Sequence, residues 1–178
     1  HVQINIHPNS LDHNNALNLI QSYDVIVDGT DNFSSRYLIS DSCVLKNKPM
    51  VYGGLFKFEG QISVFNYHGG PSYRCLFPNP PEIEEIPNCN ETGILNVAPG
   101  LIGLYQATEV LKIILGIGTP LSGKLLLLDL LTQNHFISHF RKNSEEIERI
   151  QKNKFPLTSS IQDCILDFEI SLKELDKE

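Results

Sequence analysis

The segment "DVIVDGTDNFSSRYLI", residues 24–39, carries the clearest indication of the fold. Its apolar run over residues 25–27 ends abruptly at Asp28, a pattern typical of a parallel strand that helices cover on both faces. Residues 33–47 then predict a helix, because Asn47 and the proline two positions later are typical of a helix end. A strand followed by a helix is the repeating unit of an α/β sheet.

The chain on either side continues this alternation. Residues 2–6, "VQINI", predict a short strand, and the segment that follows predicts a helix with Ser10 as its N-cap. Residues 50–54, "MVYGG", predict another short apolar strand. Because strands that alternate with helices imply βαβ units, we expect an α/β fold with a Rossmann-like, mostly parallel sheet.

The pattern then changes to one typical of antiparallel strands. Residues 60–70, "GQISVFNYHGG", alternate apolar and polar side chains, and residues 71–77, "PSYRCLF", predict a further strand after a Gly-Gly-Pro turn. Residues 123–140 predict two strands around a turn near residues 132–134. These segments predict an antiparallel extension of the sheet.

Residues 98–116, "APGLIGLYQATEVLKIILG", predict the longest helix of the chain. Pro99 lies near its start and Gly116 near its end, which is the usual asymmetry of helix termini. Apolar residues cover most of its circumference, so we expect a largely buried helix. Gly100 and Gly103 would permit close packing against a neighbouring backbone.

Composition and charge narrow the range of functions. The chain has 178 residues, 41% of them hydrophobic, and a mean hydropathy of −0.12, as in ordinary soluble proteins. A net charge of −7 argues against nucleic acid or an anionic membrane as a partner. No signal peptide is evident, and no uninterrupted apolar segment approaches about 18 residues. The four cysteines are scattered without a CxxC pair, which favours a reducing, cytoplasmic setting.

Two parts of the chain differ in composition. We expect residues 1–142 to form the folded domain, and we expect residues 143–178, rich in charges of both signs, to form a linker. Short helices are predicted within this linker at residues 144–151 and 171–176. Because the first residue is a histidine and not methionine, we expect the native start to lie upstream.

The polar residues that end the first apolar strand form one candidate site. Asp28, Asp31 and Asn32 lie where a parallel strand gives way to a helix, and ligands gather at the carboxyl ends of such strands. Two carboxylates and an amide could hold Mg²⁺ through oxygen. An alternative is that these residues only cap the helix and complement its dipole.

Cys89 is the second candidate. It lies in residues 78–92, "PNPPEIEEIPNCNET", a segment whose prolines and glutamates predict a long loop. An exposed thiol on such a loop could react with an activated carbonyl or sulfur, and the start of the next helix could lower its pKa. The neighbouring glutamates oppose that effect, and a chance surface cysteine remains the alternative.

The other cysteines and histidines indicate packing rather than chemistry. Cys43 is expected to pack within its helix, Cys75 to be half-buried in a strand, and Cys164 carries no signal. His135 and His139 fall in a predicted strand, so we expect exposed or packed side chains and no metal. The glycines of "GIGTP" follow a helix and lack the strand context of a nucleotide-binding loop.

Taken together, the segments resemble the MoeB/ThiF/HesA family, whose members are relatives of ubiquitin-activating enzymes. The resemblance spans residues 2–142 and rests on four motifs in the family's order. They are "DVIVDGTDNFSSRYLI", "GGLFKFEGQISVF", "YRCLFP" and "NCNETGILNVAPGLIGLYQATEVLKIILG".

The resemblance implies an ATP-dependent adenylyltransferase. Such enzymes use ATP and Mg²⁺ to adenylate the C-terminal Gly-Gly of a ubiquitin-like sulfur-carrier protein for molybdopterin or thiamine biosynthesis. By motif position, Asp31 corresponds to the Mg²⁺-binding catalytic aspartate, and Asp31 with Asn32 to nucleotide-binding positions. Cys89 corresponds to a loop cysteine that forms an acyl or persulfide link in some members, and Arg36 matches a motif position without an assigned role. The resemblance also implies a homodimer.

The chain departs from the family pattern in three places. The family's N-terminal nucleotide-binding half is missing here, so we expect the isolated chain to be inactive. Ser72 replaces the first cysteine of a zinc-binding pair whose second position is Cys75, and the later pair is absent, so we expect no zinc. The segment "EISLKEL", residues 169–175, resembles the opening of a rhodanese domain, which follows this module in some relatives.

Two other functions remain open at this point. The chain could be a binding module that docks a ubiquitin-like tail without chemistry, or an ordinary Rossmann-like nucleotide-binding protein. A glycine-rich loop with an arginine pair upstream would favour the enzyme, and their absence would favour the binding module. An acid about 20 residues after such a loop would favour the nucleotide-binding protein.

Overall fold

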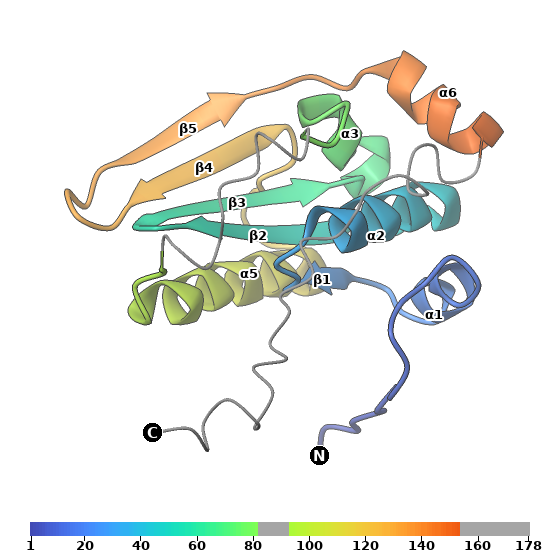
Figure 1. Ribbon diagram of the computed structural model, residues 1–178, viewed down its shortest axis with the longest axis horizontal. Helices are drawn as coiled ribbons and strands as arrows, with labels where there is room; N and C mark the ends of the chain where they lie inside the picture. The colour runs from blue at the N-terminus through green and yellow to red at the C-terminus, as the bar shows by residue number, and fades with distance from the viewer. Residues whose placement is uncertain (82–92, 154–178) are drawn as a thin grey trace, which may run out of the picture.

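The computed structural model describes residues 1–81 and 93–153 (Figure 1). The elements in chain order are α1 (Ala16–Gln21), β1 (Ile26–Asp28), α2 (Phe33–Lys46), β2 (Met50–Phe56), β3 (Glu59–Phe65), a 3₁₀ turn (Tyr67–Gly69), α3 (Tyr73–Leu76), α5 (Val97–Leu115), β4 (Lys124–Asp129), β5 (His135–His139) and α6 (Ser144–Asn153).

The strands form one five-stranded sheet in the order β1-β2-β3-β4-β5. β1 pairs with β2 in parallel, with Asp28 opposite Tyr52, because α2 carries the chain back between them. The remaining neighbours pair antiparallel. A two-residue connection, with Lys57 at φ 53°, joins β2 to β3 and forces this direction. The α/β class and the antiparallel extension are confirmed, and among the described strands parallel pairing is limited to β1 and β2, less than we expected.

Helices cover both faces of the sheet (Figure 1). α5 packs along one face, where Ile102 contacts the side chains of β3 and β4 in a small apolar core. α1, α2 and α3 pack on the other face around a larger core. Alternate residues of one strand supply the two cores, since Leu125 belongs to the larger and Leu126 to the smaller.

Most predicted elements are present close to their expected limits. α2 begins after Asn32 and ends at Asn47, which adopts the left-handed conformation at φ 51°. β4 and β5 flank the predicted turn, where Gln133 has φ 61°. α6 confirms the helix expected at residues 144–151, and the helix expected at residues 171–176 lies outside the described residues.

Three local predictions were wrong. Residues 2–6 form no strand and have no strand partner in the described chain, and Val2 is 90% exposed. α1 begins only at Ala16, and Ser10 caps no helix; its carbonyl accepts a hydrogen bond from Asn15. Residues 71–77 contain helix α3 in place of a strand, because Ser72 and Cys75 form a capping box at its start.

α5 is buried on one face only, which corrects the expectation of a largely buried helix. Its buried residues are Ala98, Ile102, Gln106 and Glu109. Their spacing of three or four places them on one stripe toward the sheet. Leu104 is 69% exposed, and a Cβ atom added at Gly100 or Gly103 would meet nothing within 4 Å.

α5 also meets the length and composition criteria of a membrane-spanning helix. It has 19 residues and a mean hydropathy of 1.2 in its most apolar window, although polar residues interrupt that window, as expected from the sequence. The helices of soluble domains pass the same test, and the buried stripe of α5 carries the polar side chains of Gln106 and Glu109. The expected absence of a membrane partner stays a prediction.

Candidate functional site

The carboxyl end of β1 is built around the side chain of Asp28. This carboxylate is fully buried and turns back on its own loop, where Oδ1 accepts hydrogen bonds from the backbone nitrogen of Thr30 at 2.9 Å and from its hydroxyl at 2.6 Å. A short polar side chain that bonds the backbone two residues on is a standard turn device. Asp28 therefore shapes the loop and is withdrawn from solvent.

Arg36 supports the same loop from α2. Its Nη2 donates to the Thr30 carbonyl at 2.8 Å, and its Nε lies 3.6 Å from Asp28 Oδ2. Its guanidinium carbon lies 5.3 Å from the ring centre of Tyr52. Asp28 Oδ2 and Arg36 Nε are buried without a hydrogen bond in the described structure, so charge attraction alone joins these two atoms.

The protonation of Asp28 reflects two opposing effects. Burial raises the pKa of this carboxyl above its usual value, while the two Thr30 hydrogen bonds and the Arg36 charge act in the opposite direction. The burial effect is the larger one. The neighbours therefore offset only part of the burial effect, and the pKa of this carboxyl stays raised.

Asn32 caps helix α2, as the alternative interpretation held. Its Oδ1 accepts from the backbone nitrogen of Ser35 at 2.8 Å and from the Ser34 hydroxyl at 3.0 Å. The side-chain oxygen is therefore occupied within the helix end. A nucleotide contact by Asn32 stays a prediction.

Asp31 is the one carboxylate of this loop that is exposed. The three candidate oxygen-bearing residues are therefore not brought together, since Asp28 turns inward and Asn32 caps α2. Mg²⁺ is usually held through one or two carboxylates together with water and substrate phosphates. A single exposed carboxylate at the end of a strand fits that manner of binding, whereas the expected trio does not form.

Gln106 is a part of this site that the sequence interpretation missed. From α5, its Nε2 donates to the Asp28 carbonyl at 2.7 Å and to the Val51 carbonyl at 3.3 Å. The available signal was a pair of polar residues, Gln106 and Glu109, spaced by three on a mostly apolar helix. The identity of the bonded carbonyls could not be read from that spacing.

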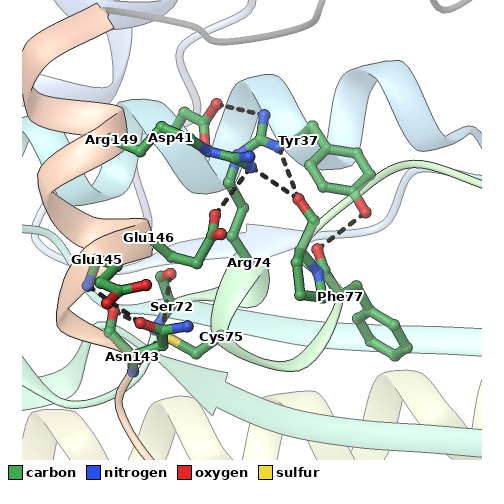
Figure 2. A network of polar contacts seen from close by, with 11 residues as sticks. Tyr37, Asp41, Ser72, Arg74, Cys75, Phe77, Asn143, Glu145, Glu146 and Arg149 are labelled. Atoms are coloured by element: carbon green, nitrogen blue, oxygen red, sulfur yellow. Dashed lines mark hydrogen bonds and ion pairs between the residues drawn. The ribbon is translucent and has the colours of Figure 1, made fainter.

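A second polar network joins side chains of α2, α3 and α6 (Figure 2). Arg74 of α3 makes two bonds of 2.8 Å to the carboxylate of Asp41, and both side chains are fully buried. The Tyr37 ring lies 4.5 Å from the Arg74 guanidinium carbon, and the Tyr37 hydroxyl donates to the Phe77 carbonyl at 3.0 Å.

The same network holds the backbone that leaves α3. The Pro78 carbonyl accepts from Arg74 Nη1 at 3.3 Å and from Arg149 Nη2 of α6 at 2.8 Å, and Arg149 also pairs with Glu146 (Figure 2). Three side chains, from α2, α3 and α6, therefore fix the residues that enter the segment containing Cys89. Cys89 itself lies outside the described residues, as does Cys164.

Ser72 and Cys75 stand at the positions of the zinc-binding pair, and the Cys75 sulfur accepts hydrogen bonds from the backbone. Cys75 Sγ accepts from the backbone nitrogen of Ser72 at 3.3 Å and from that of Asn143 at 3.2 Å (Figure 2). Within residues 1–81 and 93–153, no three His, Cys, Asp or Glu side chains gather as a metal would require. The donor set around Cys75 therefore does not fit zinc, which prefers four ligands.

The structure also places the cysteines and histidines for which we expected no chemical role. Cys43 is fully buried, and burial raises the pKa of its thiol, so it packs as expected. Cys75 is half-buried as expected, although in a helix and not a strand. His135 and His139 lie on β5 with exposed side chains.

Comparisons with known proteins identify relatives over most of the chain. The profile of the ThiF family matches residues 1–149. "Adenylyltransferase and sulfurtransferase MOCS3" of Aedes aegypti is 51% identical over 128 residues, which are 72% of this chain and 29% of that protein. "Sulfur carrier protein adenylyltransferase" of Thermus thermophilus is 47% identical over 135 residues, 73% of this chain and 50% of that protein.

Solved structures support the fold. Escherichia coli MccB, in a crystal structure with MccA-N7isoASN, has a TM-score of 0.63 and 15% identity, over 78% of this chain and 43% of that one. MccB with ATP gives a TM-score of 0.63 at 17% identity, with the same two coverages. The chain thus spans half or less of the length of these relatives.

Proposed function

We propose, on the premise that this chain belongs to the ThiF family, that the full-length protein adenylates the C-terminal Gly-Gly of a ubiquitin-like sulfur-carrier protein. The observation that supports the proposal most directly is the exposed Asp31 on a loop fastened by Thr30, Arg36 and Gln106. In this reaction a carboxylate oxygen of the carrier attacks the α-phosphate of ATP, and pyrophosphate leaves.

The residues of the loop have distinct roles in this proposal. Mg²⁺, when bound, would neutralise phosphate charge as the carboxylate approaches. Asp31 would be its protein ligand, and Asn32 would hold the start of α2 toward the nucleotide. Arg36 keeps the loop in place through the Thr30 carbonyl and is therefore a positioning residue.

Cys89 is proposed to take part after adenylation. Its thiolate would attack the activated carrier carbonyl, AMP would leave, and an acyl link to sulfur would form. Alternatively, the terminal sulfur of a persulfide on Cys89 would displace AMP from the adenylate and form an acyl disulfide. A second thiol would then attack the Cys89 sulfur, release the carrier thiocarboxylate and end in a disulfide with Cys89. The rigid attachment of Phe77 and Pro78 supports a defined path for the chain that enters this segment.

The proposal extends to partner, metal and assembly. The nucleotide-binding half belongs to the longer protein, so the isolated chain is expected to lack activity. Zinc is not required, which Ser72 supports, because a serine hydroxyl stands where the pair would need a thiolate ligand. A homodimer is proposed, and the exposed apolar side chains of α5, with Leu104 69% and Ile114 65% exposed, support a contact there. Sedimentation of the full-length protein beside a Leu104→Ser variant tests the dimer, which the variant should weaken.

The central experiment combines the full-length protein with ATP, Mg²⁺ and candidate carriers that end in Gly-Gly. Mass spectrometry should detect the acyl-adenylate and, after sulfide is added as the sulfur source, the thiocarboxylate formed as AMP leaves. Asp31→Ala should abolish the adenylate, whereas Cys89→Ser should retain it and lose any adduct at that cysteine. Binding of a carrier without any adenylate would instead favour a docking module.

A further inference from the structure

The Gln106 side chain of α5 makes hydrogen bonds to the backbone of two neighbouring strands, β1 and β2. The amide nitrogen carries two hydrogens, and the two bonds run to Asp28 at the end of β1 and to Val51 in β2. The side chain is 7% exposed, so these bonds lie out of water. A residue distant in sequence thereby fixes the carbonyl of the last residue of β1.

Gly53 makes room for this amide. A Cβ atom at that position would lie 2.7 Å from Gln106 Cδ and 2.8 Å from Nε2, closer than real contacts allow. It would also lie 2.8 Å from Ile102 Cγ2. The absence of a side chain in β2 is therefore what permits Gln106 to reach the strand ends.

We propose that Gln106 is a positioning residue that orients the loop from Asp28 to Asp31. The Asp28 carbonyl sets the direction in which the chain leaves β1, and Asp31 follows three residues later. The other hydrogen bonds that hold this loop come from Thr30 within it and from Arg36 of α2. The bond from Gln106 is the contribution of α5. The inference rests on the proposed function, in which Asp31 is the metal ligand.

The test uses the full-length protein and a Gln106→Met variant, which keeps the length of the side chain and removes both donors. Mn²⁺ binding in the presence of ATP, followed by electron paramagnetic resonance, should weaken about tenfold, as is typical when a partner behind a metal ligand is lost. Hydrogen exchange at residues 28–32 of the metal-free protein should become faster. A purely structural role would lower thermal stability and leave metal affinity unchanged.

Thr108→Ala is the matched control on the same helix. Thr108 is exposed, and its hydroxyl bonds the Leu104 carbonyl within α5. This variant should match the wild type in Mn²⁺ affinity and in exchange at residues 28–32. A folded Gln106→Met variant that also matches the wild type in both measurements would overturn the proposal.

Gly53→Ala provides a second route if Gln106→Met does not fold. The added methyl group displaces the same amide, so metal affinity should fall in the same direction. Both changes act through the Gln106 side chain. The effect of Gly53→Ala on metal affinity should therefore be smaller in a Gln106→Ala background than in the wild type. Equal effects in the two backgrounds would contradict the inference. If the wild type forms no adenylate, the proposed function fails, while hydrogen exchange still decides whether Gln106 orders the loop.

Discussion

The buried carboxyl group of Asp28 shapes its loop, but burial of its charged form is unfavourable for folding. Its Oδ1 shapes the loop through Thr30, whereas its Oδ2 is buried and lies 3.6 Å from Arg36 Nε. Burial raises the pKa of this group in the folded protein above the unfolded value near 3.8. The folded state then binds the proton more tightly than the unfolded state does.

This difference predicts how pH affects the stability of an Asp28→Asn variant. The free energy contributed by Asp28 is most favourable below pH 3.8 and is lost as pH rises through the raised folded pKa. Asparagine keeps an oxygen for Thr30 and does not titrate. The variant should therefore gain stability relative to the wild type as pH rises above about 3.8, measured by thermal denaturation. A stability difference independent of pH would contradict the expected shift.

The buried ion pair of Arg74 and Asp41 predicts a large loss of folding stability when one partner is removed. Removal of one partner in Arg74→Met leaves a buried carboxylate uncompensated and should cost about 3–5 kcal/mol in urea denaturation. The double variant with Asp41→Leu should recover part of that loss, because no charge then remains buried. Lys152→Ala is the control, since its pair with Glu148 is exposed and worth about 0–1 kcal/mol.

At the scale of elements, α6 packs against α2 and α3 of the domain. Its Ile150 is fully buried, and its Arg149 bonds the Pro78 carbonyl beside α3. Its first turn follows Asn143, whose backbone nitrogen donates to Cys75 Sγ and whose side chain accepts from Glu145 (Figure 2). The division between domain and linker at residue 142 stays a prediction, and α6 offers a way to test it.

Ile150→Ala should lower the free energy of unfolding by about 2–5 kcal/mol, because it removes a buried side chain and leaves a cavity. Chemical denaturation of the full-length protein measures the change. Gln151→Ala is the neighbouring exposed control and should have little effect. If the two variants are equally stable, α6 contributes nothing to the domain and the linker prediction holds.

At the scale of the whole molecule, local pattern and tertiary contact decided different things. The apolar run that ends at Asp28 and the left-handed Asn47 after α2 are local features, and both were predictable from the sequence. The Asn32 cap was also foreseen as an alternative, because capping depends on residues three positions apart. The prediction for residues 71–77 was wrong because their aromatic and apolar side chains are typical of a strand, whereas the capping box of Ser72 and Cys75 starts a helix.

The sequence alone determined the α/β alternation from β1 to β2, the antiparallel extension and the family, because these depend on periodicity, helix ends and the order of short motifs. Only the tertiary structure decided that Asp28 turns inward while Asp31 is exposed, that α5 buries one stripe, and that Gln106 bonds the Asp28 carbonyl. Each of these depends on contacts between segments far apart along the chain. A one-dimensional pattern records which residues can be buried, but the packing of distant elements selects which face is covered and which carbonyl lies within reach.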